Sequence, residues 1–163
     1  KDFQDKHIHK EAGMKETIVM GCLPIDSPNA QTSLPDWEKV EHPPSSEDGP
    51  IIALHVVKFN DRTELGETPE KMAEYTLNAS SIGIQQGVRI SGWFGVEGTI
   101  VGDGREWDQV RFNAFPSKAA FMAVAQDPAR LEAEKAHREP AISDTYALIV
   151  RTKFDQIKDS ITQ

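Results

Sequence analysis

Residues 106–152 read EWDQVRFNAFPSKAAFMAVAQDPARLEAEKAHREPAISDTYALIVRT, and they carry the clearest fold signal in the chain of 163 residues. Apolar and polar side chains alternate over residues 106–115, which predicts a β-strand. Pro116 ends that strand, and Ser117 is placed to cap a helix over residues 118–126. The stretch therefore begins with a strand that leads directly into a helix.

The second half of the stretch continues the helix and adds another strand. Asp127 and Pro128 form a second capping pair, so we expect the helix to bend or restart there and to continue to about Arg138. Pro140 cannot continue a helix, and the apolar residues 145–151 predict a strand. The whole stretch therefore predicts a β-α-β succession.

A similar succession precedes this stretch. Residues 51–60 are rich in Ile, Val and Leu and predict a strand that is covered on both faces. Thr68 is placed to cap a helix over about residues 69–84, and residues 88–101 alternate as a second strand. The glycines at residues 102–104 predict a turn that leads into the next strand.

Together these elements follow the order β-α-β-β-α-β over residues 51–152, which is the split β-α-β unit of a ferredoxin-like α+β fold. We expect an antiparallel four-stranded sheet with its helices on one side. Pairing the open side with a second copy would bury it in a barrel-like homodimer. Residues 153–163 form a polar C-terminal tail.

Residues 1–50 differ from this domain in composition. Six of the ten prolines lie between Pro24 and Pro50, and the segment carries −5 of the net charge of −8. We interpret it as a Pro-rich acidic extension or arm, since such a segment is hard to pack as an independent core. It is either a partly ordered extension or an arm that wraps a dimer, with Trp37 as an anchor and a short strand at residues 17–23.

Composition excludes several classes of function. The chain is acidic and has no cluster of basic residues, so no nucleic-acid footprint is expected. Its single cysteine, Cys22, rules out an internal disulfide and fits a reducing cytoplasm. No apolar run approaches the about 18–20 residues of a membrane span. His7 and His9 have no further ligand nearby, so we expect neither a metal nor an organic cofactor.

Strand alternation divides the candidate site residues between two faces, because side chains two apart share a face. In the third strand, the face predicted to lie under the helices comprises Val110, Phe112 and Ala114. Arg111 and Asn113 then lie on the open face. If His55 points to the same side, it converges there with Trp93 and Glu97.

This set is typical of a small-molecule pocket, with aromatic walls that include Trp107 and a few polar groups. A buried His55 can act as a general base at neutral pH, and Arg111 or Asn113 can stabilise a developing oxyanion. The alternative is structural: Arg111 pairs with Glu97 across adjacent strands, and His55 is a hydrogen-bonded interface residue.

A second candidate cluster lies at the end of the last helix and comprises His137, Arg138 and Asp144. Basic residues at this position compensate the negative end of a helix dipole, and Asp144 is placed to accept a hydrogen bond from either one. The functional alternative is that the cluster lines one mouth of the pocket.

Several short motifs in residues 102–150 are more specific in combination than singly. They are Trp107-Asp108, Phe115-Pro116-Ser117, Asp127-Pro128, His137-Arg138 and Ala141-Ile142-Ser143-Asp144-Thr145. In this combination the chain resembles an uncharacterised group within the dimeric α+β barrel superfamily. The resemblance implies a ferredoxin-like protomer that dimerises through its sheet.

The wider superfamily includes cofactor-independent monooxygenases, isomerases, haem-degrading enzymes and ligand-sensing domains, so the resemblance leaves two hypotheses open. The first is an enzyme that acts without metal or organic cofactor on a small aromatic or polyketide-like molecule. The second is a non-catalytic ligand-binding or dimerisation module. A deep cavity with His55 and Arg111 pointing into it favours the enzyme, whereas a cavity filled by Trp93 and Phe115 favours the module.

Overall fold

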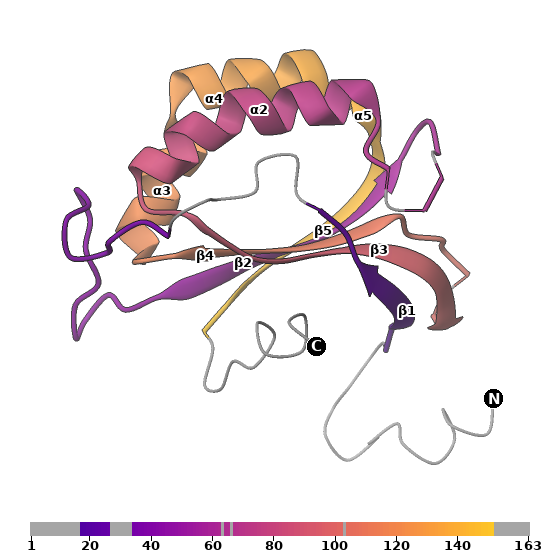
Figure 1. The fold of residues 1–163 in the computed structure, drawn as a ribbon, viewed down its shortest axis with the longest axis horizontal. Helices are drawn as coiled ribbons and strands as arrows, with labels where there is room; N and C mark the ends of the chain where they lie inside the picture. Colours follow the sequence, from indigo (N-terminus) through magenta and orange to yellow (C-terminus); the bar gives the residue numbers. More distant parts are fainter. Residues whose placement is uncertain (1–16, 27–33, 63, 66, 103, 152–163) are drawn as a thin grey trace.

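The computed structural model describes residues 17–26, 34–62, 64–65, 67–102 and 104–151. Within them, a five-stranded antiparallel sheet carries its helices on one face (Figure 1). The strands are β1 (Val19–Pro24), β2 (Ile51–Phe59), β3 (Arg89–Val101), β4 (Gln109–Phe115) and β5 (Ile142–Val150). The helical segments are α2 (Glu70–Gln85), α3 (Lys118–Gln126), α4 (Pro128–Ala133), the π-helical turn η2 (Glu134–Arg138) and α5 (Glu139–Ala141).

The sheet has the strand order β1-β3-β4-β2-β5. Its last four strands follow the predicted β-α-β-β-α-β succession of a ferredoxin-like unit. The prediction of a four-stranded sheet is wrong, because β1 pairs along β3, with Val19 opposite Val101 and Pro24 opposite Phe94. This fifth strand comes from the Pro-rich segment and covers backbone groups of β3 that would otherwise be unpaired.

Side-chain caps determine where two of the helices start. The Ser117 hydroxyl accepts a hydrogen bond from the Ala120 N–H at 3.0 Å. The Asp127 carboxylate accepts from the N–H groups of Ala129 and Arg130 at 2.9 and 3.0 Å. These contacts confirm the predicted start of α3 and the predicted restart at α4.

Four features differ from the predictions: the cap of α2, the starts of β4 and β5, and the end of the last helix, which does not stop at Arg138 but continues as α5 through Pro140 to Ala141. Helix α2 begins at Glu70 without a side-chain cap, and Thr68 instead accepts a hydrogen bond from the Gln109 amide at 2.9 Å. Strand β4 begins at Gln109 and not at residue 106, while β5 begins earlier than expected, at Ile142. Thr68 is therefore tied to the sheet and does not cap the helix.

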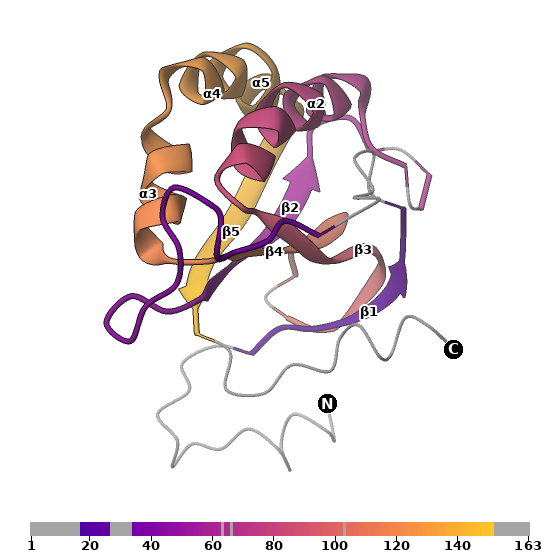
Figure 2. The ribbon, with the colours of Figure 1, turned by 60° about the vertical axis from the view of Figure 1, so that its left-hand side comes forward.

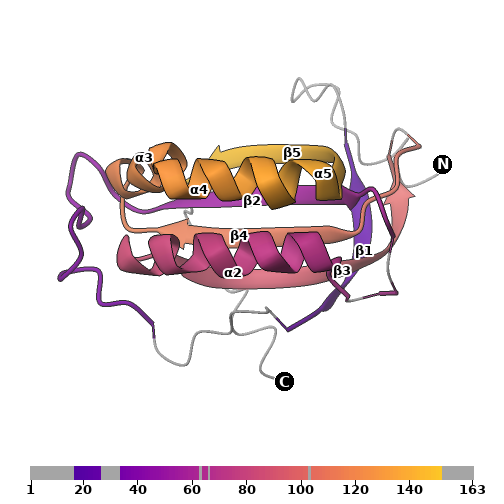
Figure 3. The same cartoon turned by 90° about the horizontal axis from the view of Figure 1, so that it is seen from above.

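Residues 34–50 pack against one end of the domain, beside α3 (Figures 2 and 3). The Trp37 indole N–H donates to the Gly87 carbonyl at 2.7 Å, and the Arg89 guanidinium lies 3.9 Å from the centroid of the Trp37 ring. The Asp48 carboxylate accepts from two backbone N–H groups at the start of α3, at 2.8 and 3.0 Å. Trp37 therefore anchors this part of the arm on its own domain. The segments outside the described residues include 1–16, 27–33 and the predicted tail.

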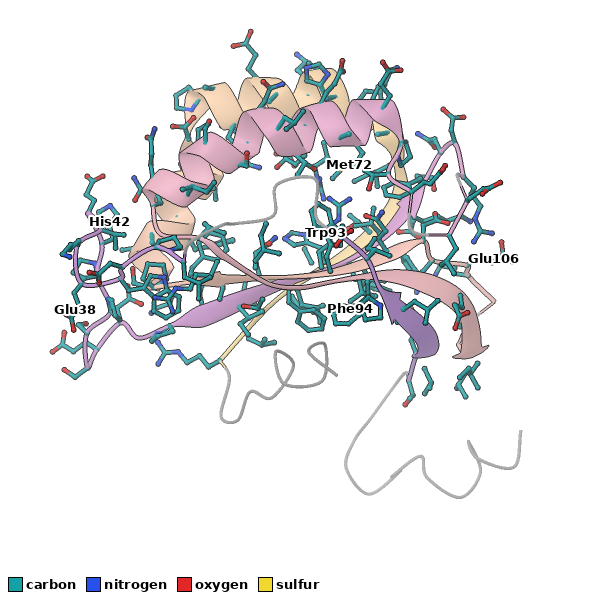
Figure 4. All side chains as sticks on the ribbon, in the orientation of Figure 1. Glu38, His42, Met72, Trp93, Phe94 and Glu106 are labelled. Carbon is teal, nitrogen blue, oxygen red and sulfur yellow. The ribbon has the colours of Figure 1, made fainter. Side chains whose placement is uncertain are left out.

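The two faces of the sheet carry different apolar clusters. On the face away from the helices, the buried members are Val56, Val96, Trp107 and Val110. Under the helices, Val57 and Phe59 pack against Met72 of α2, and Phe115 packs near Phe121 of α3. Figure 4 shows Trp93 on the helix side of the sheet and its neighbour Phe94 on the other side.

The prediction of which side chains lie under the helices is wrong. Val110 and Phe112 pack with Leu54 and Val56 on the face away from the helices, and Ala114 has the same parity on β4. Arg111 lies on the helix side. Alternation separates two faces of a strand, but only the packing of the crossover helices decides which of the two is covered.

Candidate functional site

A cavity of about 410 Å³ lies between the sheet and the helices. Its floor comes from β2, β3, β4 and β5, and its roof comes from α2, α3, α4 and η2. Figure 3 shows α2 and α4 running side by side across the sheet. The predicted site residues that line the cavity are His55, Trp93, Arg111, Asn113 and Arg138. Small-molecule sites are typically about 300–1,000 Å³ in volume, so this cavity is of suitable size.

Strand register places three of these residues in one row. His55 on β2 is paired with Arg111 on β4, and Arg111 is paired with Trp93 on β3. Directly opposed residues on antiparallel strands point to the same face, so all three side chains project under the helices. Asn113 follows two residues after Arg111 and shares its face. The expected convergence is therefore present, but on the covered face of the sheet and not on the open one.

Gln109 holds the Arg111 side chain in position. The Gln109 side-chain oxygen accepts from Arg111 Nε at 3.0 Å, from Arg111 Nη2, and from Trp93 Nε1 at 3.1 Å. Its amide nitrogen donates to the Glu67 carbonyl and the Thr68 hydroxyl. The Arg111 guanidinium also lies 4.2 Å from the centroid of the Trp93 ring. Gln109 thus links the loop before α2 to the cationic floor of the cavity.

Charged residues continue in the roof. Glu134 pairs with Arg130 at 3.0 Å and with Arg138 at 2.8 Å, and all three side chains line the cavity. Arg130 also donates to the Tyr75 hydroxyl at 3.1 Å. The roof thus carries a shared carboxylate between two guanidinium groups.

Burial and neighbouring positive charges keep the His55 ring neutral at physiological pH. Desolvation, followed by the charges of Arg138 and Arg111, lowers the pKa of His55 to about 4. Desolvation, followed by Arg138, lowers the pKa of Arg111 to about 9, so Arg111 is still cationic at neutral pH. The site therefore presents an unprotonated imidazole beside a buried cation.

Four predicted site residues lie outside this cavity. Glu97 is exposed near the end of β3, where it lines a separate hollow with Arg62 and Asp108, so the predicted ion pair between Glu97 and Arg111 is wrong. Trp107 is buried on the opposite face of the sheet, where its ring centroid lies 5.1 Å from that of Tyr146. It precedes the regular part of β4, so the alternation used to place it does not extend that far.

The cluster predicted at the end of the last helix is divided in the structure. His137 pairs with Glu74 of α2 at 2.9 Å, and Asp144 accepts from Arg105 at 3.3 Å. Asp144 therefore has another partner than the predicted His137 or Arg138. Of the three residues, Arg138 alone lines the cavity.

Sequence reasoning missed Gln109, Arg130, Glu134 and Tyr75 as site residues. Arg130, Glu134 and Arg138 are spaced four residues apart, which places them on one face of a helix, so a signal for the roof cluster was present. The role of Gln109 had no sequence signal, because its partners come from a loop and two strands.

Among the described residues, no group of three or more His, Cys, Asp or Glu side chains is arranged to hold a metal ion. In the same part of the chain, no helix is long and apolar enough to cross a membrane.

The strand order and the succession of elements define a ferredoxin-like α+β protein. No family model and no curated protein matches the sequence. Among solved structures, the chain is similar to a protein of unknown function from Rhodopseudomonas palustris. The two share 26% sequence identity with a TM-score of 0.58, over 69% of this chain and 96% of the other.

Two more distant structures are also similar. One is a dabb family protein with a ferredoxin-like fold from Mesorhizobium loti, at 11% identity and a TM-score of 0.47 over 64% of this chain and 97% of that one. The other is a dimeric protein of unknown function and ferredoxin-like fold from Bacteroides fragilis, at 13% identity and a TM-score of 0.44 over the same shares. The strand order of the sheet itself confirms the predicted ferredoxin-like fold, and a fold by itself does not specify an activity.

Proposed function

We propose that this protein binds a small organic molecule in the cavity under its helices and acts on it without a metal or organic cofactor. The observation that carries the proposal is the row of His55, Arg111 and Trp93 on three neighbouring strands, all facing a cavity of about 410 Å³. Trp93 and Phe115 line this space and do not fill it. An open cavity that both His55 and Arg111 face favours an enzyme.

The reaction that these groups support best is proton transfer at a carbon next to a carbonyl group. His55 accepts the proton; its pKa of about 4 makes it a weaker base than a free imidazole, and the negative charge that forms on the substrate favours its protonation. Arg111, with Asn113, stabilises the resulting enolate oxygen. Return of the proton to another carbon of the same molecule completes an isomerisation. In the corresponding monooxygenase chemistry, the same carbanion reduces dioxygen and takes up a proton to give a hydroperoxide, which loses water and leaves one oxygen atom on the substrate as a carbonyl group.

We also propose that the working form is a homodimer formed through the open face of the sheet. Phe94, Phe112 and Tyr146 are only partly buried there, and Leu148 is 51% exposed. Leu148 is paired with Leu54 of the same cluster, so it extends this apolar face to β5. A second copy would remove the face from water.

A non-catalytic binding module is the second candidate. The observation that favours it is that Arg111 Nε and Nη2 both donate hydrogen bonds to the side-chain oxygen of Gln109. These bonds give the guanidinium a structural role. In that case the protein would bind a ligand in the same cavity without converting it.

The test is hydrogen exchange in heavy water with a panel of aryl ketones, β-keto acids and 1,3-diketones. Nuclear magnetic resonance would follow deuterium incorporation next to the carbonyl group. We expect the protein to accelerate exchange for at least one compound, and His55→Gln to abolish the acceleration while the compound still binds. His42→Gln, outside the cavity, is the matched control. Binding without accelerated exchange favours the module, and exchange unchanged in His55→Gln removes His55 from the mechanism.

A further inference from the structure

We infer that the ligand of the cavity is a planar organic anion, an aromatic or enolised carboxylate, whose charged end binds Arg111. This inference rests on the proposed function and names the class of substrate. Three observations carry it: a buried cation that has no counter-ion among the described residues, a positive balance of charge around the cavity, and an apolar region that continues from the charged one.

Arg111 is the buried cation. Its side chain is only 7% exposed, and no acidic side chain among the described residues forms an ion pair with it. Its polar partner is the neutral amide oxygen of Gln109, which accepts from Nε and Nη2. A guanidinium has five N–H groups, so Nη1 and the second Nη2 hydrogen remain for a ligand. A buried cation is stable when it is paired, and a bound carboxylate would complete the pair.

The balance of charge around the cavity is positive although the chain as a whole is acidic. The charged side chains that line it are Arg111, Arg130, Arg138 and Glu134. Three cations face one carboxylate, and Glu134 is already shared between Arg130 and Arg138. The net charge of the whole chain is −8, so a positive interior is a local property of this site. It attracts anions and disfavours cationic ligands.

The remainder of the cavity wall is apolar and aromatic. Trp93 stands beside Arg111, and Phe115 and Phe121 meet edge to face with ring centroids 5.2 Å apart. Ile84 and Val124 add aliphatic surface to the same wall. A ligand that fits both regions has one charged end and a flat apolar body, which inorganic phosphate lacks.

The experiment compares two probes of nearly equal shape, 1-naphthoate and uncharged 1-naphthamide, by isothermal titration calorimetry on the full chain. We expect naphthoate to bind at least ten-fold more tightly than naphthamide at pH 7. Arg111→Gln should remove most of this preference, whereas Arg151→Gln should retain it. Arg151 is exposed and outside the cavity, so that variant loses the same charge elsewhere.

The outcomes separate this inference from the proposed function. If both probes bind equally well and Ala79→Phe, which fills the cavity, blocks both, the cavity is a ligand site and the anion inference is overturned. If neither probe binds, the proposed function fails as well. Inorganic phosphate that binds as tightly as naphthoate would also overturn the inference. The comparison of the two probes on the unmodified protein decides the question even if Arg111→Gln does not fold.

Discussion

His55 on β2 and Arg111 on β4 lie directly opposite each other, and both side chains line the cavity between the sheet and the helices. This relationship places an imidazole and a guanidinium in the same covered space. Burial, followed by the charges of Arg138 and Arg111, lowers the pKa of His55, and burial, followed by the charge of Arg138, lowers the pKa of Arg111. We therefore expect the stability of the protein to depend on the charge state of this pair.

Stability should fall as the pH is lowered from about 6.5 to about 4. The folded pKa of His55 lies below its unfolded value of 6.5, so the unfolded chain binds more protons in this window. Burial, Arg138, Arg111 and Arg130 oppose protonation in the folded state, and Glu134 favours it. The loss should reach about 3 kcal/mol at the low end of the window.

Urea unfolding at several pH values checks this expectation. His55→Gln removes the imidazole, so the free energy of unfolding should change much less with pH in this window. His42→Gln, outside the cavity, should leave the pH dependence of the unfolding free energy unchanged. A slope that is the same in His55→Gln as in the unmodified protein would contradict the assignment to His55.

Gln109→Leu should destabilise the protein by about 3 kcal/mol, because it leaves the Trp93 indole N–H and the buried Arg111 guanidinium without their acceptor. Equilibrium denaturation measures the change. Gln85→Leu, at an exposed position at the end of α2, is the matched control and should change stability by less than about 0.5 kcal/mol. Equal effects of the two substitutions would show that Gln109 does not act as the acceptor.

Trp37→Ala should release residues 34–50 from the domain. It removes the hydrogen bond to Gly87 and the stacking of Arg89, which together should contribute about 1–3 kcal/mol. Limited proteolysis should then cut this segment faster. Leu34→Ala, whose side chain is 53% exposed, is the control and should leave the rate unchanged.

Leu148→Glu should convert the proposed dimer to a monomer. The side chain extends the open apolar face, and a carboxylate buried there against a second copy would lack a partner. Light scattering coupled to size-exclusion chromatography should give twice the mass of one chain for the unmodified protein and the mass of one chain for the variant. Leu131→Glu, 47% exposed on α4, is the control, and dissociation by this variant too would contradict the proposed interface.

Local signals in the sequence were sufficient for the order of elements. Ser117 and Asp127 are caps whose hydrogen bonds reach only two or three residues along the chain, so their positions determine where α3 and α4 start. The predicted cap at Thr68 is wrong because a contact distant in sequence replaces it. The Thr68 hydroxyl is bonded to Gln109, far away in sequence, and that contact replaces the cap that its position favoured.

The candidate site was predicted only in part for the same reason. Arg111 and Asn113 share a face because alternation along one strand is local, and the pairing of β2 with β4 adds His55 to that face. Glu97 and Trp107 were grouped with them by extending alternation beyond the regular pairing of β3 with β4. Gln109 and the roof residue Arg130 belong to the site through contacts between different elements.

The sequence by itself determined the β-α-β-β-α-β order, the starts of α3 and α4 and the residue types available for chemistry, because these depend on neighbours within a few positions. Tertiary structure alone decided that β1 extends the sheet along β3, and that Arg111 faces the helices while Val110 faces away. The physical reason is that a strand has two equivalent faces until helices pack on one of them. On β4 the apolar pair Val110 and Phe112 was left on the open face, and the polar row of His55 and Arg111 was enclosed.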